Sequence, residues 1–378
     1  MKLAVLKERR EGEKRVAATP ETVKKFIGLG FSVSVEAGAG DNSSIPDSAF
    51  KDAGAAIAKS AKDAARGADV ILKVQGPDKM EMGALPKGSI LAATLRPHAE
   101  MDNIKALGKA GVMAFAMELM PRISRAQSMD VLSSQSNLAG YKSVLDAANE
   151  YGRAFPMMMT AAGTVAPAKV LVMGAGVAGL QAIATAKRLG AIVSATDVRM
   201  AAKEQVESLG GKFVMVEDDE AKDAETSGGY AKEMSKAYQK KQAALIAATI
   251  TKQDIVITTA LIPGRPAPML ITKAMVKTMK PGSVIVDLAV EMGGNCELSK
   301  PGKVVDAYGV KIVGHLNVPS RLAADASALY AKNLFNFIAL MVDPEKKELK
   351  IDWEDEVMTG TAMTRNGKVI HPNYQGGK

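Results

Sequence analysis

The sequence predicts an α/β protein with two Rossmann-like domains, each built on a parallel sheet, the second domain inserted into the first. Short apolar runs alternate with helical patterns along most of the chain, as expected of parallel strands joined by helices. At 378 residues the chain is also long enough for more than one core. An apolar-periodic helix expected from Ser320 onward would return the chain to its first domain. We therefore predict domains at 1–132 plus 325–378 and at 133–324.

The composition is that of a globular protein, with 47% apolar and 24% charged residues. Aromatic residues are only 4%, and the net charge of +8 comes from scattered Lys and Arg, so nucleic-acid binding is not expected. Apolar runs of about 18 residues, which a membrane-spanning helix needs, do not occur. The single cysteine, Cys296, excludes an intrachain disulfide, fits a reducing cytoplasm and is expected to be a buried small residue.

In the first domain, strands are predicted at "KLAVLK", "FSVSVEAG", "ADVILKV", "GSILAATL" and "GVMAFAM". The helix in "TPETVKKFIGLG" has Thr19 as N-cap, Pro20 at its first position and Gly30 at its end. A polar stretch at 117–143, "MELMPRISRAQSMDVLSSQSNLAGYKS", begins without helix or strand periodicity. It is either a solvated linker or a segment that holds a ligand. Residues 133–153 are predicted to form a long helix capped by a serine.

The second domain is predicted to contain strands at "KVLVM", "IVSATD", "GGKFVMV", "QDIVITTA", "GSVIVDLA" and "VKIVGH", with a helix at "PAPMLITKAMVKTM". The methionine-rich "PMMMTAAG" is expected to pack at the connector between the domains. The charged stretch 217–242 carries Gly228, Gly229 and Tyr230 and interrupts the pattern. Such a segment is either a lid over a ligand or a solvated insertion.

The motif G-x-G-x-x-G at Gly174, Gly176 and Gly179 lies between the strand "KVLVM" and the helix "VAGLQAIATAKRL". Its glycines allow a tight turn, close approach to a pyrophosphate and close packing of helix against strand. Asp197 ends the next strand, where an acid binds the ribose 2′-hydroxyl of NAD and repels a 2′-phosphate. The motif therefore predicts NAD(H) binding in preference to NADP(H), although Arg199 close by weakens that preference.

Other chemistry is not indicated. His98, His315 and His371 lie far apart in the sequence without metal-ligand spacing, so we expect structural or exposed histidines and no metal site.

Several long runs resemble the alanine dehydrogenase and transhydrogenase family. "KERREGEKRVAATPETVKKFIGLGFSVSVEAGAG" is similar to the N-terminus of both branches. "MELMPRISRAQSMDVLSSQSNLAGY", "GVAGLQAIATAKRLGA", "TALIPGRPAP", "VIVDLAVEMGGNC" and "GHLNVPSR" resemble the transhydrogenase branch, and the likeness covers essentially the whole chain.

The resemblance implies the NAD(H)-binding alpha subunit (domain I) of a proton-translocating NAD(P) transhydrogenase. Hydride would pass between NAD(H) here and NADP(H) on a beta subunit, coupled to proton translocation by a membrane subunit. A homodimer is expected, on the cytoplasmic face of the inner membrane through its partner subunits.

The resemblance also implies site residues. Arg122, Gln127, Asp130 and Ser133 are expected to hold the nicotinamide and its ribose for hydride transfer, with Tyr230 closing over the cofactor. The full set expected to bind NAD(H) is Arg122, Gln127, Ser128, Met129, Asp130, Gly174, Gly176, Val177, Ala178, Gly179, Asp197, Val198, Arg199, Gly229, Tyr230, Gln242 and Leu261.

Two other functions remain open at this point. An alanine dehydrogenase-like enzyme would need a general acid/base, but His98 is out of step with that branch's histidine, and Glu291 stands at its aspartate. Arg15 matches its substrate-binding arginine, although we favour a structural ion pair. An NAD-sensing module without catalytic activity is the third possibility.

Overall fold

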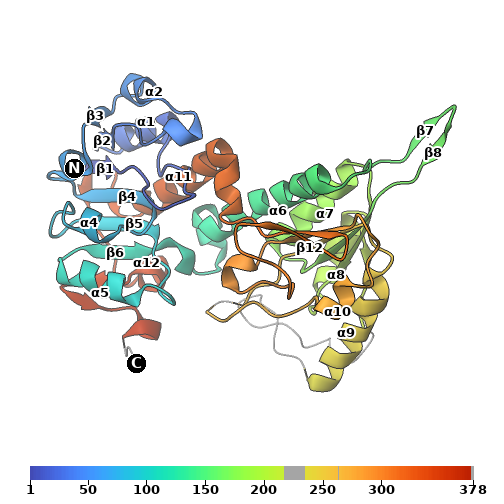
Figure 1. Cartoon of the computed structure of the whole chain (residues 1–378). Coiled ribbons are helices and arrows are strands. Elements are labelled where there is room, and N and C mark those ends of the chain that lie inside the picture. Colours follow the sequence, from blue (N-terminus) through green and yellow to red (C-terminus); the bar gives the residue numbers. More distant parts are fainter. Residues whose placement is uncertain (217–234, 263, 376–378) are drawn as a thin grey trace. The chain divides into compact units, whose positions relative to one another are not determined.

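The computed structural model divides into two compact units, each containing one large sheet (Figure 1). It describes residues 1–216, 235–262 and 264–375. Unit 1 is Met1–Gln135 with Ser320–Lys378, and unit 2 is Ser136–Pro319. The domain boundaries predicted from the sequence, after residues 132 and 324, differ from both boundaries between these units, which lie after residues 135 and 319.

The sheet of unit 1 is parallel throughout, with strand order β3-β2-β1-β4-β5-β6. This order reverses direction between β1 and β4, as in a doubly wound fold. The five predicted strands are present, and the short edge strand β3 was not predicted. The strands are β1 Lys2–Val5, β2 Ser32–Glu36, β3 Ala56–Ala58, β4 Val70–Gln75, β5 Ile90–Thr94 and β6 Met113–Ala116.

Helices cover both faces of this sheet, and two short antiparallel pairs complete the unit. Thr19 forms a capping box with Thr22 at the start of α1, with Pro20 at the first position, as predicted. Gly30, after the helix, has a φ of +94°. The helices of the unit are α1 Pro20–Gly28, α2 Asp47–Asp52, α3 Ala61–Ala65, α4 Lys79–Met82, α5 Met101–Lys109, α11 Ala323–Ala339 and α12 Glu356–Thr361, and the strand pairs are β16 Val342–Asp343 with β17 Glu348–Leu349 and β18 Thr364–Arg365 with β19 Lys368–Val369.

Both faces of the unit 1 sheet are apolar, because alternate residues of each strand enter different cores. Leu72 and Phe115 face a core that includes α1 and Phe337 of α11. Ile71 and Ala114 face the opposite core, which includes α3 and α5. Helix α11 thus belongs to the first core, and this explains why the chain returns to unit 1.

The sheet of unit 2 has the order β11-β10-β9-β12-β13-β15-β14. It is parallel except for the edge strand β14, which pairs antiparallel with β15 and was not predicted. The elements are β9 Lys169–Met173, α7 Val177–Arg188, β10 Ile192–Thr196, α8 Ala202–Ser208, β11 Lys212–Phe213, α9 Lys236–Ile250, β12 Ile255–Thr258, α10 Lys273–Val276, β13 Val284–Asp287, β14 Val304–Ala307 and β15 Val310–Val313.

The predicted helix at 133–153 is α6, Val131–Glu150. It begins earlier than predicted, and its cap is Asp130 rather than a serine, because the Asp130 carboxylate accepts the Ser133 backbone N–H at 2.9 Å. The preceding stretch was predicted to be an irregular loop. It contains 3₁₀ turns at Met117–Leu119 and Ser124–Met129, whose short length leaves no periodicity in the sequence.

Two predictions in unit 2 were wrong in extent. The helix at "PAPMLITKAMVKTM" is reduced to α10, since two prolines precede it and Thr272 caps it. Residues 236–242 belong to α9, capped by Ser235, and not to a loop. The rest of the charged stretch 217–242 lies outside the described residues.

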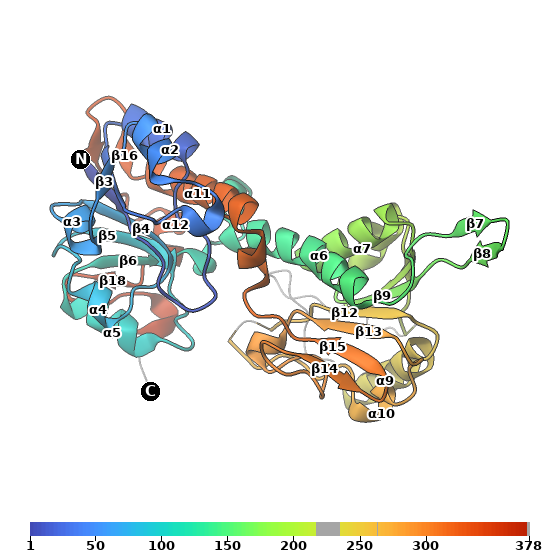
Figure 2. The same cartoon turned by 45° about the horizontal axis from the view of Figure 1, so that its top comes forward.

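The methionine-rich stretch does not pack at the connector, so that prediction was wrong. It forms an antiparallel hairpin, β7 Met158–Thr160 with β8 Gly163–Val165, that extends away from the rest of unit 2 (Figures 1 and 2). Met157 and Met159 are 59% and 77% exposed. Gly163, which follows the turn of the hairpin, has a φ of +133° that suits glycine. In the described residues of the chain, no helix has both the length and the apolar character needed to cross a membrane.

Candidate functional site

The glycine motif forms a tight turn between β9 and α7 in unit 2. Gly174 has a φ of +101°, and a Cβ there would lie 2.6 Å from Thr259 Oγ1. A Cβ on Gly179 would lie only 1.8 Å from the Gly174 carbonyl oxygen. These two glycines are therefore required by the folded chain itself, whether or not a ligand is bound.

Gly176 differs from the other two glycines. Its φ of −77° suits any residue, and a Cβ there would meet no atom of residues 1–216, 235–262 or 264–375 within 4 Å. It is also the N-cap of the 12-residue helix α7, and no side chain among the described residues caps that end. The helix therefore presents backbone N–H groups and a positive dipole end to an open space, which fits a pyrophosphate.

Asp197 follows β10 and lies against this turn. Its Oδ2 accepts the Ala175 N–H at 2.7 Å and a guanidinium N–H of Arg199 at 2.8 Å. Its Oδ1 accepts the backbone N–H and the Nε–H of Arg199, both at 2.9 Å. Burial tends to raise the pKa of Asp197, but the bonds and charge of Arg199 outweigh it and hold the pKa below its ordinary value.

These four bonds use the four lone-pair positions of the carboxylate. A ribose hydroxyl could therefore bond Asp197 only after Arg199 gives up one of its contacts. The glycine turn, Asp197 and Arg199 lie together as predicted, but the ion pair that occupies the carboxylate was not visible in the sequence.

The neighbouring strand ends support the turn through residues that the sequence did not single out. Thr259 Oγ donates to the Gly174 carbonyl at 3.0 Å. The Asn295 side chain bonds both the N–H and the C=O of Ala260, at 3.0 and 2.9 Å. The Asp287 carboxylate in turn accepts the Asn295 N–H at 2.9 Å. The one signal in the sequence was an Asp at the end of a buried strand, before the glycine pair of "VEMGGNC".

Gly140, in the middle of α6, was also missed. A Cβ there would lie 2.0 Å from the Ala178 carbonyl oxygen, in the first turn of α7. Glycine in a helix interior costs about 1 kcal/mol relative to alanine, so a packing reason is expected. Here the reason is contact between two helix backbones beside the glycine turn.

The remaining unit 2 residues predicted to bind NAD(H) lie at different places. Val177 and Leu261 are 40% and 47% exposed, and Gln242 is a half-buried residue of α9. Val198 packs against buried Tyr238. Gly229 and Tyr230 lie outside the described residues.

The predicted nicotinamide residues of unit 1 lie on one continuous segment leading into α6. Asp130 accepts both the N–H and the hydroxyl of Ser133, at 2.9 and 2.6 Å. Arg122 and Gln127 are exposed. Met129 is an exception, because its side chain is 3% exposed and packs in the core. Any ligand contact of Met129 must come from its backbone.

The residues that would matter for an amino-acid dehydrogenase are engaged elsewhere. Arg15 is buried and bonds Glu13 through Nε at 2.8 Å and through a terminal nitrogen at 2.7 Å, which favours the structural interpretation. Glu291 accepts the backbone N–H of Asn317. His98 lies against Tyr374, whose hydroxyl is 2.8 Å from its Nε2.

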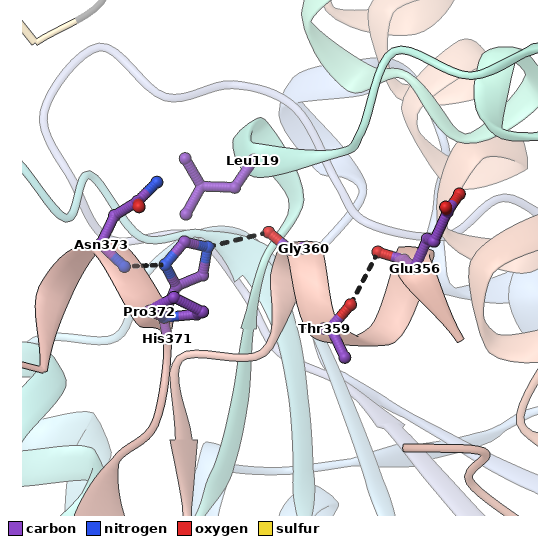
Figure 3. A pocket seen from close by; sticks show the side chains of 7 residues that line it. All are labelled: Leu119, Glu356, Thr359, Gly360, His371, Pro372 and Asn373. Atoms are coloured by element: carbon purple, nitrogen blue, oxygen red, sulfur yellow. Dashed lines mark hydrogen bonds between the residues drawn. The ribbon is translucent and has the colours of Figure 1, made fainter. Parts of the chain in front are cut away.

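His371 lines a small cavity of unit 1 together with Leu119, Gly360 and Asn373 (Figure 3). Its Nδ1 accepts the Asn373 N–H at 3.2 Å, so its Nε2 carries the proton and donates to the Gly360 carbonyl at 3.1 Å. Burial lowers the pKa of His371. A neutral histidine bonded at both nitrogens is structural, as expected. The cavity contains none of the predicted cofactor residues.

Comparison with known proteins agrees with this geometry. The N-terminal domain model of the alanine dehydrogenase/PNT family matches residues 4–139, and the C-terminal domain model matches residues 143–372. The chain is 61% identical to a protein of Rhodospirillum rubrum named as the first portion of NAD(P) transhydrogenase subunit alpha, over 100% of this chain and 99% of that protein.

Among solved structures, a transhydrogenase from Sinorhizobium meliloti is 57% identical, with a TM-score of 0.90, and the match covers 98% of this chain and 100% of that one. An L-alanine dehydrogenase is more distant, at 26% identity and a TM-score of 0.83, over 99% and 98% of the two chains. The chain belongs to the alanine dehydrogenase/PNT family, and its close relatives are on the transhydrogenase side.

Proposed function

We propose that this chain is the NAD(H)-binding subunit of a proton-translocating NAD(P) transhydrogenase. Hydride would pass between NAD(H) on this chain and NADP(H) on a partner component, coupled to proton translocation. The observation that carries the proposal is the turn at Gly176, which the described part of the chain leaves open to an anion and without a side-chain cap, with the Asp197 carboxylate bonded to the same turn. The names of the close relatives give the reaction class.

The residues present fit a dinucleotide. The N-terminal N–H groups of α7 would bind the pyrophosphate, and Asp197 would bind the adenosine ribose once Arg199 releases one bond. The exposed Leu261 and the half-buried Gln242 would border the same nucleotide. The carboxylate disfavours a 2′-phosphate, which supports NAD(H) over NADP(H).

Arg122, Gln127, Asp130 and Ser133 would orient the nicotinamide. The bound nucleotide supplies the carbon that gives or takes the hydride. Gln127 offers an amide that can pair with the carboxamide of the ring, and Asp130 and Ser133 offer a carboxylate and a hydroxyl to the ribose. A hydride passing between two nicotinamides needs no protein acid or base, so the task of these residues is geometry and exclusion of water.

An alanine dehydrogenase activity has no support in the site. Such an enzyme needs a free base and a free cation near the nicotinamide. Of the described candidates, Glu291 instead accepts a backbone N–H, and Arg15 is paired with Glu13.

The partners follow from the same proposal. A relative that is named as a portion of one subunit, alpha, implies further subunits. These would be a beta subunit that binds NADP(H) and a membrane subunit, which would hold this chain at the cytoplasmic face of the inner membrane.

We also propose a homodimer in which the hairpin β7–β8 is covered by a second copy. A two-stranded ribbon is marginal in water by itself, and this one exposes Met157 and Met159. Met159→Lys should lower the mass found by sedimentation equilibrium. A wild-type chain that is monomeric would contradict the proposed dimer, and the proposal for the nucleotide site would still stand.

The proposed function is tested by two assays on the purified chain. In the first assay, NADH should change the fluorescence of the protein at a lower concentration than NADPH does. In the second assay, neither alanine nor pyruvate should be turned over as a substrate. Equal affinity for the two nucleotides, or turnover with alanine, would overturn the proposal.

A further inference from the structure

Helix α11 presents two amides to the segment predicted to hold the nicotinamide. Asn333 and Asn336 are three residues apart and so lie on one face of the helix. Their Nδ2 groups donate to the Ser128 carbonyl oxygen at 2.8 and 3.1 Å. One backbone carbonyl of the segment is therefore fixed by two side chains from a helix that packs in the core of unit 1.

Asn333 also contacts the other end of the segment. Its Oδ1 accepts the hydroxyl of Ser134 at 2.7 Å. One side chain thus joins Ser128 to Ser134, and Asp130 and Ser133 lie between the two attachment points. Asn333 is 6% exposed, so water competes little for these bonds.

The contacts continue into the buried charges of unit 1. Gln135 Nε2 is 3.3 Å from the Ser134 hydroxyl and donates to the Ala326 carbonyl at 3.1 Å. Gln135 Oε1 accepts from Arg15 at 2.8 Å, and Arg15 is paired with Glu13. Hydrogen bonds therefore run without a break through Glu13, Arg15, Gln135, Ser134, Asn333 and Ser128.

We propose that this hydrogen-bond chain, which runs from buried Arg15 to the exposed Ser128, positions the nicotinamide-holding segment, with Asn333 as its principal positioning residue. Arg15 then acts through Gln135 and Ser134 on the geometry of the segment, and not by binding a substrate. The inference rests on the proposed function, because positioning matters only if the segment holds a reacting ring.

The expected effect is on rate more than on affinity. A displacement of about 1 Å at reacting atoms can lower a rate roughly a hundredfold. In the proposed function, affinity comes mainly from the pyrophosphate and adenosine contacts, which Asn333 does not touch. Asn333→Ala should therefore slow hydride transfer at least about tenfold and change the NADH dissociation constant less than about threefold.

The test uses the full chain with and without the NADP(H)-binding component of a transhydrogenase. Three variants are compared with wild type: Asn333→Ala, the half-buried Asn336→Ala, and Asn103→Ala as a control. Asn103 donates to Glu100 at 3.0 Å on α5, in the same unit and outside the chain of bonds. Asn336→Ala should slow transfer less than Asn333→Ala, because one donor to Ser128 remains, and Asn103→Ala should match wild type.

Hydrogen exchange on the nucleotide-free chain supplies a readout that needs no turnover. The backbone amides of Ser133 and Ser134 should exchange faster in Asn333→Ala, and amides of the central strand β4 should not. Wild-type transfer and exchange rates in both Asn333→Ala and Asn336→Ala would overturn the inference. The inference would also be overturned if hydride transfer slowed in Asn333→Ala by the same factor as the affinity for NADH fell. If the wild-type chain transfers no hydride even with the NADP(H)-binding component present, the proposed function fails instead.

Discussion

Replacing Gly176 by alanine separates the ligand-binding glycine from the glycines that the fold requires. In the part of the chain that the structure describes, the new methyl group would meet no atom within 4 Å, and the φ of −77° suits alanine. Folding stability should therefore change by less than about 1 kcal/mol, because the restriction that alanine places on the unfolded chain is offset by its poorer fit at the N-cap of α7.

Nucleotide binding should respond in the opposite direction. The methyl group would occupy the space through which a pyrophosphate reaches the backbone N–H groups of α7. Losing a hydrogen bond to a charged group costs about 1.5–3 kcal/mol, so the NADH dissociation constant should rise roughly tenfold to a hundredfold or more.

Gly179→Ala is the matched comparison. Its Cβ would lie 1.8 Å from the Gly174 carbonyl oxygen, so the backbone must move. Overpacking of this kind costs about 1–3 kcal/mol or more, and here stability should fall together with binding.

Denaturant unfolding followed by circular dichroism, beside NADH titration by calorimetry, distinguishes the two variants. A Gly176→Ala chain that binds NADH within a factor of about two of wild type would refute the placement of the pyrophosphate at this turn. A large loss of stability in the same variant would show that the turn is packed differently.

Three further predictions concern charge and geometry. Asp197→Asn keeps the shape but removes the carboxylate, so the preference for NADH over NADPH should narrow in fluorescence titrations; an unchanged ratio would locate discrimination elsewhere. Gln127→Asn shortens the reach of the amide, so single-turnover hydride transfer should slow far more than NADH binding weakens; equal modest changes would remove Gln127 from ring positioning. Burial raises the pKa of Glu8 to about 7, although Lys73 lowers it, from an ordinary 4.5. The folded state then holds a proton that the unfolded state releases, so this contribution to stability is present below about pH 4.5 and is lost as pH rises to about 7. Glu8 should contribute a loss on the order of 1–3 kcal/mol across that range, and Glu8→Gln should remove that part in urea titrations. The loss from Glu118, whose pKa burial also raises to about 7, should remain; parallel profiles of wild type and variant would contradict the prediction.

The elements of the fold that depend on local residue patterns were predictable. The buried strand before the Gly174–Gly179 turn is an apolar run, and Thr19 with Pro20 marks a helix start, so the structure agrees there. The hairpin at Met158–Val165 was misplaced because methionines are usually buried, and nothing local indicates where a ribbon will extend.

The contacts that complete the site were beyond local patterns. The bonds of Asn333 to Ser128 and Ser134 join residues about two hundred positions apart, so only the fold brings them together. Arg199 and Asp197 are close in the sequence, but the sequence alone does not decide whether they pair with each other or each contact a ligand. The contact at Gly140 did leave a visible signal, a glycine within a long helix.

The central claim is that this chain presents NADH to a second nucleotide and not to an amino acid. The direct measurement is stopped-flow hydride transfer from NADH on this chain to an NADP⁺ analogue, with and without the NADP(H)-binding component of a transhydrogenase. We predict rapid hydride transfer only when that component is present, and no transfer to pyruvate with ammonia in its absence. NADH oxidation by pyruvate and ammonia on the chain alone, or no transfer with the component present and both nucleotides bound, would contradict it.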